Sequence, residues 1–172
     1  MPTPVDSPAG STDTVDKRSD RLSWPRAVVA TDSSAAGLVL RVMLGVVMFP
    51  HGAQKLLGWF GGYGFSATMN HFTENMGIPW VLALLAVLAE SVGAVALIVG
   101  LLTRIAALGI GVVMTVAIVM VHWQNGFFMN WLGNKQGEGF EYHLLALAMA
   151  AALIIRGGGL WSVDRALAGK PT

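Results

Sequence analysis

Four long apolar segments follow one another along the chain, separated by shorter stretches rich in polar residues and glycine. A helix rises ~1.5 Å per residue, so about 20 apolar residues cross the ~30 Å hydrocarbon core of a bilayer. The first three segments reach this length, whereas the fourth needs its flanking residues or a locally thinner bilayer. The pattern predicts an all-α, integral membrane four-helix bundle, with a short re-entrant or buried segment as the alternative for the fourth helix. The predicted spans are residues 35–57, 78–102, 105–123 and 140–155.

Residues 1–34 follow a different pattern, because they are rich in Pro, Ser, Thr and Asp and show no apolar period. Such a segment cannot bury enough apolar surface to fold, and we interpret it as a disordered, mobile cytoplasmic tail. The first long apolar run begins too late for a secretory signal, so we expect the tail to be retained. The transmembrane domain then covers residues 35–168, and residues 169–172 form a C-terminal tail.

Composition supports a membrane protein and excludes several kinds of chemistry. The chain is 54% hydrophobic and only 12% charged, about half of the roughly 25% charge typical of soluble domains. The absence of cysteine excludes disulfides, thiolate nucleophiles, cysteine-bound zinc and iron–sulfur clusters. A net charge of +1 gives no basic field for nucleic acid, which we therefore exclude as a partner.

Lysine and arginine are distributed unevenly between the predicted loops. Eight of them lie before the first span, between the second and third spans, or after the fourth, against two in the other loops. Cytoplasmic loops carry the excess of Lys and Arg, so both termini are expected in the cytoplasm and the two long loops outside. The eight are Lys17, Arg18, Arg21, Arg26, Arg104, Arg156, Arg165 and Lys170, and the two are Lys55 and Lys135.

Two charged residues lie well inside the predicted spans. This orientation places Arg41 about a third of the way into the first span and Glu90 near the bilayer centre. An ionisable residue at the centre costs on the order of 3 kcal/mol by insertion scales, so Glu90 needs a partner, a proton or water. We interpret Arg41 and Glu90 as a structural ion pair, because a long guanidinium side chain can bridge their difference in depth. The alternative is that Glu90 belongs to a proton relay.

A polar cluster is predicted at the outer end of the bundle, from residues that lie on three helices but share one membrane level. Imidazole, ammonium and carboxylate groups together can bind a small polar ring and move its protons. In this interpretation Glu90 and Glu141 are the catalytic acid–base groups, and Gly45 and Gly52 let the ring or its tail approach the first helix. The alternative is that the cluster is ordinary interfacial polarity. No metal site is expected, because the histidines lack a short ligand-spacing motif. The ligand-binding candidates are His51, Lys55, His122 and His143.

Several short motifs lie along the same segments: Phe-Pro-His-Gly-Ala-Gln-Lys at 49–55, Ala-Glu-Ser-Val-Gly at 89–93 and Gly-Glu-Gly-Phe-Glu-Tyr-His at 137–143. These motifs resemble those of the DoxX family, and the resemblance extends over residues 35–168 in the same order. It implies a multi-pass protein of the bacterial inner (plasma) membrane. The family includes the small membrane subunit of thiosulfate:quinone oxidoreductase and proteins linked to quinone or catechol stress, and the resemblance also implies sulfurtransferase or superoxide dismutase partners.

Residues and resemblance together lead us to expect the integral membrane subunit of a redox system, binding a quinone or related small aromatic at the outer end of the bundle. The expected partners are the lipid bilayer and either a soluble redox enzyme or a second membrane subunit. The chain could also form a homo-oligomer through the small-residue face of the second span, and this alternative stays open. No metal or covalent cofactor is implied. The alternative is a non-catalytic membrane scaffold or assembly factor for a soluble redox partner, and a small transporter is a third interpretation. Enzyme subunit and binding protein both stay open at this point.

Overall fold

The computed structural model describes residues 28–168, and this part of the chain contains helices and no strand, as expected for the all-α class. Residues 1–27 and 169–172, predicted to belong to the two tails, lie outside the described residues. The elements in chain order are α2 (Ala35–Leu57), α3 (Gly64–Asn70), the π-helix η1 (His71–Asn75), α4 (Trp80–Val99), α5 (Thr103–Ala117), the π-helix η2 (Ile118–His122), the 3-10 helix η3 (Trp123–Asn125), α6 (Glu141–Arg156) and α7 (Val163–Ala168).

Three continuous helical segments are long and apolar enough to cross a bilayer, and they correspond to the first three predicted spans. Their outward faces expose large apolar side chains such as Val46, Leu85 and Val112, which suits contact with lipid. The chain is therefore a multi-pass protein surrounded by a lipid bilayer. α6 has only 16 residues, so the fourth crossing of the bilayer stays a prediction. The cytoplasmic position of the two termini also stays a prediction. The three segments are Ala35–Leu57, Trp80–Val99 and Thr103–Asn125.

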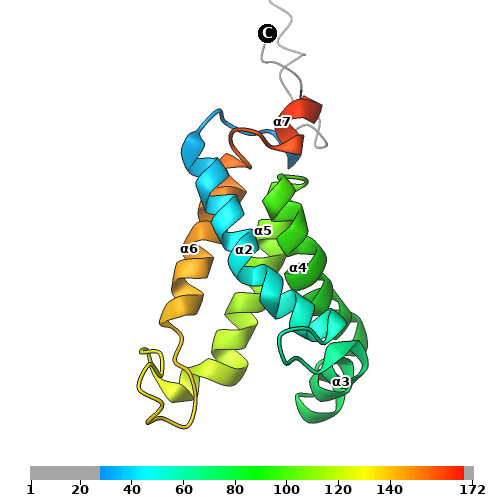
Figure 1. Cartoon of the computed structure of the whole chain (residues 1–172), viewed down its shortest axis with the longest axis vertical. Coiled ribbons are helices and arrows are strands. Elements are labelled where there is room, and N and C mark those ends of the chain that lie inside the picture. The colour runs from blue at the N-terminus through cyan, green and yellow to red at the C-terminus, as the bar shows by residue number, and fades with distance from the viewer. Residues whose placement is uncertain (1–27, 169–172) are drawn as a thin grey trace, which may run out of the picture.

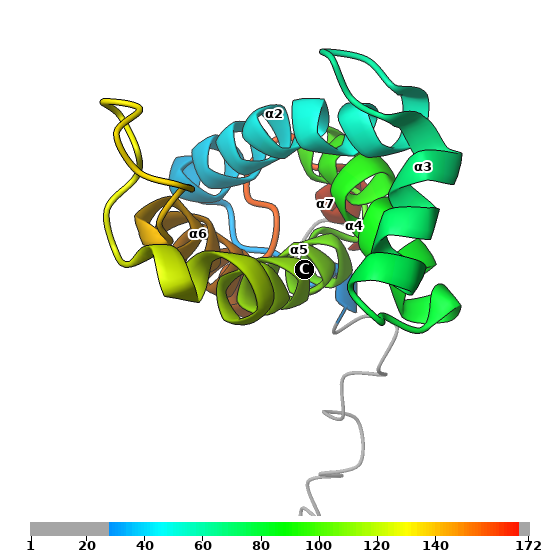
Figure 2. The same cartoon turned by 90° about the horizontal axis from the view of Figure 1, so that it is seen from below.

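The four long helices pack side by side around a common core (Figures 1 and 2). α2 packs along α4, α4 along α5 and α5 along α6, and α6 returns to contact α2. Leucine, methionine and alanine side chains fill the space between them, so each helix buries one apolar stripe and turns the rest outward. The largest fully buried apolar members are Leu44, Met48, Leu97, Ile110 and Leu153.

The two ends of the bundle are built differently (Figure 1). One end, which we call the terminal end, carries α7 and the segment that leads into α2. The opposite end, the loop end, carries α3 with η1 and the loop between η3 and α6. Both long loops therefore lie at the same end of the bundle, the end where the polar cluster is predicted.

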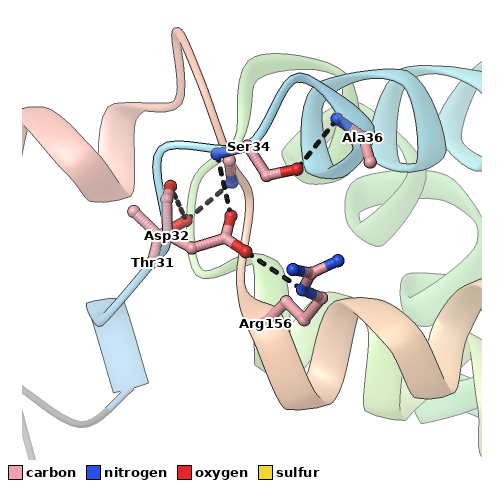
Figure 3. Close-up of polar contacts among 6 residues, drawn as sticks. Thr31, Asp32, Ser34, Ala36 and Arg156 are labelled. Carbon is pink, nitrogen blue, oxygen red and sulfur yellow. Dashed lines mark hydrogen bonds and ion pairs between the residues drawn. The ribbon is translucent and has the colours of Figure 1, made fainter.

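The segment before α2, expected to belong to the mobile tail, makes specific contacts at the terminal end (Figure 3). Ser34 Oγ accepts a hydrogen bond from Ala36 N at 3.0 Å and caps α2. Asp32 Oδ1 accepts from Ser34 N at 3.1 Å, and its Oδ2 pairs with Arg156 Nε at 3.0 Å. The folded unit therefore includes residues ahead of the predicted boundary at residue 35.

Arg41 is 2% exposed and lies at the terminal end, where its guanidinium donates hydrogen bonds to five backbone carbonyls. The predicted structural ion pair between Arg41 and Glu90 is not formed, because Glu90 pairs with Lys55 instead. Side chains on a helix lean toward its N-terminus, and α2 and α4 are antiparallel, so Arg41 and Glu90 lean toward opposite ends of the bundle. The five acceptors belong to Leu97, Ile98, Gly158, Leu160 and Trp161.

Candidate functional site

α2 and α4 pack closely because α2 presents two glycines to its neighbour. A Cβ atom at Gly52 would overlap the backbone of Glu90 and Ser91, and one at Gly45 would lie 2.8 Å from Ala94 O. Both glycines therefore admit the neighbouring helix. This corrects the prediction that they let a ligand ring or tail approach α2, because α4 fills that space.

The close approach brings Lys55 of α2 against Glu90 of α4, and the two side chains form an ion pair. Glu90 is 4% exposed, whereas the Lys55 side chain is 25% exposed. The ammonium contacts Glu90 Oε2 directly, so the ion pair occupies this buried oxygen. Glu90 therefore has a partner that compensates its charge, as an ionisable residue inside a membrane requires.

Two ring side chains continue from this ion pair toward α6. The rings of His51 on α2 and Tyr142 on α6 have centroids 6.4 Å apart. His51 and Lys55 stand four residues apart on α2, so both lie on one face of this helix. The Tyr142 hydroxyl donates to Met48 Sδ at 3.6 Å, which is a weak acceptor. Tyr142 is a member of the site that sequence reasoning missed, and its position immediately before His143 in the 137–143 motif is the signal that could have identified it.

His122 and His143 form a close pair between α5 and α6, with ring centroids 4.1 Å apart. His122 Nδ1 lies 2.8 Å from the carbonyl oxygen of Glu138. A carbonyl only accepts, so Nδ1 carries a proton and Nε2 of the neutral ring is free to accept. His143 is 7% exposed, and its Nδ1 is a buried nitrogen without a hydrogen-bond partner. The pair therefore offers polar atoms that the protein itself does not satisfy.

The backbone of α5 changes to a π-helix, Ile118–His122, just before this pair. Such segments turn a side chain away from the direction that an α-helix gives it, and they are frequent at functional sites. His122 is the last residue of η2, so its direction depends on this local change. Helical-wheel counting from the sequence assumes an unbroken α-helix and does not capture it.

Glu141 does not face the histidines, although it was predicted as an acid–base group of the same cluster. Its Oε1 accepts hydrogen bonds from Met129 N at 2.9 Å and from Trp131 Nε1 at 3.3 Å. Glu141 thereby holds the loop between η3 and α6 against the start of α6. Beside this loop lies a polar cavity of about 450 Å³, whose lining includes His122, Asn125 and Glu138.

The structure thus brings together most of the predicted site residues, and Glu90 joins them through its ion pair with Lys55. Within residues 28–168, no three His, Asp or Glu side chains are grouped as they would be around a metal ion. The site offers hydrogen bonds and charge from three helices and η2. We call it the polar row: Glu90, Lys55, His51, Tyr142, His143 and His122.

Comparison with known proteins agrees with this architecture. The DoxX family matches residues 36–123, which carry four of the six residues of the polar row. A protein of Bacillus subtilis (strain 168) named "Putative oxidoreductase CatD" is 30% identical over 116 residues, which cover 67% of this chain and 76% of that protein. No solved structure gives a significant match. The chain belongs to the DoxX family.

Proposed function

We propose that this chain is the quinone-binding membrane subunit of a redox system, and that the quinone head group binds at the polar row. One observation carries the proposal: His143 Nδ1 is a buried nitrogen without a hydrogen-bond partner, and it lies in one row with the buried Lys55–Glu90 ion pair. Buried polar groups are nearly always hydrogen-bonded, so an unpartnered buried nitrogen in this row of side chains favours a polar ligand between the helices.

The chemistry of the row fits a quinone ring and its quinol. Quinone carbonyls accept hydrogen bonds, and protonated imidazole, ammonium or phenol groups can donate them. Quinol hydroxyls donate, and the free Nε2 of His122 can accept. The same side chains therefore suit both oxidation states, and they can supply or take up the protons that accompany reduction. A redox partner of the chain supplies the electrons.

The family and the relative support the redox assignment and the cellular setting. The name of the Bacillus subtilis relative describes an oxidoreductase, and its similarity extends over 67% of this chain. We extend this activity to the present chain, and we assign it to the bacterial inner membrane. The electron partner in this proposal is a soluble redox enzyme or a second membrane subunit.

Purification followed by lipid extraction tests the proposal. The full chain is purified in a mild detergent, and co-purified quinone is quantified per mole of protein. We expect the wild-type chain to retain quinone and His143→Ala to lose most of it. His71→Ala is the matched control, because His71 is exposed at the loop end and pairs with Asn75 outside the polar row.

Three outcomes would contradict the proposal. One is a wild-type chain that holds no quinone and binds none when it is added. Another is a His143→Ala variant that retains as much quinone as His71→Ala. The third is a chain that captures a soluble partner in stoichiometric amount, holds no quinone, and captures the partner equally well when residues of the polar row are substituted. That result favours the scaffold alternative.

A further inference from the structure

α5 and α6 leave an apolar groove of about 340 Å³ along the outer surface of the bundle. Thr115 carries the only polar side chain of its lining, and its hydroxyl donates to Gly111 O at 2.9 Å, so the helix itself satisfies it. The groove therefore offers a ligand no hydrogen bond. Its walls include Gly111, Thr115 and Val116 of α5, and Leu147, Ala150 and Ala151 of α6.

The surroundings of this groove determine what can fill it. α5 belongs to a membrane-spanning segment, and the groove opens on exposed apolar side chains of that segment. Water is absent from the hydrocarbon core of a bilayer, and a groove that offers no hydrogen bond suits a hydrocarbon chain. Small residues at Gly111 and Ala150 keep the groove open, because larger side chains at these positions would fill it.

The groove leads toward the polar row. Leu147 follows His143 by four residues on α6, which is a rise of about 6 Å and a rotation of about 40°. The two side chains therefore lie on one face of α6, with the unpartnered Nδ1 of His143 one turn nearer the loop end. On α2, the alternative approach along Gly45 and Gly52 is closed by α4.

We infer that the groove holds the long hydrocarbon chain of the ligand whose head group binds at the polar row. This inference rests on the proposed function and narrows its substrate class. The site takes a quinone dissolved in the membrane, with its chain lying between α5 and α6, in preference to a water-soluble aromatic of the same head group. The hydrocarbon chain is covalently attached to the head group, so its binding in the groove raises the local concentration of the head group beside His122 and His143.

Binding of two probes to the full chain in phosphatidylcholine–phosphatidylglycerol nanodiscs tests the inference. One probe is a quinone with a long prenyl chain, and the other has the same head group with a methyl group in place of the chain. We expect the wild-type chain to bind the long-chain probe on the order of tenfold more tightly, which corresponds to about 1.4 kcal/mol.

Ala151→Phe is the decisive variant, because Ala151 lines the groove but is exposed, so a larger side chain fills the groove without entering the core. We expect it to abolish the preference for the long-chain probe while the short probe binds as before. Ala148→Phe is the matched control, since Ala148 is exposed on α6 outside the groove lining. It adds the same apolar surface and should keep the preference.

The possible results separate this inference from the proposed function. Equal binding of both probes by the wild-type chain overturns the inference and leaves quinone binding intact. An unchanged preference in Ala151→Phe overturns it as well, because ordinary membrane lipid then fills the groove. Failure of the wild-type chain to bind either probe overturns the proposed function itself, and the inference with it.

Discussion

Lys55 and Glu90 form an ion pair although they stand on antiparallel helices at different distances from the loop end. Lys55 lies near the C-terminus of α2, so its side chain leans back toward the middle of the bundle. Glu90 lies in the middle of α4 and leans toward the loop end. The two directions converge, and the flexible lysine stem spans the remaining distance. An ion pair at this depth is costly to break, which makes it a sensitive test of the site.

Breaking this pair from one side should destabilise the chain more than removing both partners. Lys55→Met leaves the buried Glu90 carboxylate uncompensated, and we expect the free energy of unfolding to fall by about 3 kcal/mol. Lys55→Met combined with Glu90→Gln should recover much of this loss, with a coupling energy of about 1–3 kcal/mol. The free energies of unfolding of the wild-type chain, the two single variants and the double variant, measured in mixed micelles, form a double-mutant cycle. Strictly additive effects would show that the pair contributes nothing.

Arg41 should be intolerant of lysine, despite the retained charge. A lysine ammonium cannot reach all five carbonyls that the guanidinium fork contacts. We expect Arg41→Lys to lower the free energy of unfolding by about 2–4 kcal/mol, since each buried acceptor left unpaired costs ~1–3 kcal/mol. Arg165→Lys, partly exposed at the same end, is the control and should have little effect. Recovery of Arg41→Met by Glu90→Gln would contradict the observed geometry and favour the ion pair predicted from the sequence.

Apolar length and period predicted the spans well, because both depend on properties that a single helix carries. The first predicted span, 35–57, coincides with α2, and the second and third differ from the observed helices by a few residues at their ends. Partners are harder to predict, because counting residues gives the depth of a Cα atom and not the direction of a side chain. Glu90 is the clear case. Its depth suggested Arg41 as its partner, whereas the direction of its side chain brings it to Lys55.

The positions of the candidate site residues were predicted in part. The four residues proposed as ligand-binding lie in the polar row at one level of the bundle, and they range from the exposed His51 to the buried His143. Glu141 shares that level but faces the loop, and only the loop conformation reveals its hydrogen bonds to Met129 and Trp131. The direction of His122 depends on the π-helix before it, which no apolar period in the sequence indicates.

Gly52 should not accept even one additional methyl group. Its Cβ would overlap the backbone of Glu90, which cannot move without separating α2 from α4. We expect Gly52→Ala to lower the yield of monodisperse protein sharply and to lower its melting temperature in detergent. Gly111→Ala is the control, because here the added Cβ has room: it would lie 3.8 Å from the Ala150 side chain. It should leave stability unchanged or raise it by up to about 1 kcal/mol, the ordinary gain of alanine over glycine in a helix. Equal behaviour of the two variants would contradict this account of the α2–α4 contact.

Glu141 should act by holding the loop between η3 and α6, and not through its charge. Glu141→Gln keeps an oxygen that can accept from Met129 N and Trp131 Nε1, whereas Glu141→Ala leaves both donors free. Loss of these hydrogen bonds costs ~1–2 kcal/mol of local stability, so tryptic cleavage after the exposed Lys135 should become about tenfold faster in Glu141→Ala. Glu141→Gln should be cleaved at nearly the wild-type rate and should retain bound quinone. A Glu141→Gln variant that keeps the wild-type cleavage rate but loses quinone would instead show that the charge of Glu141 acts on the ligand, as the sequence had suggested.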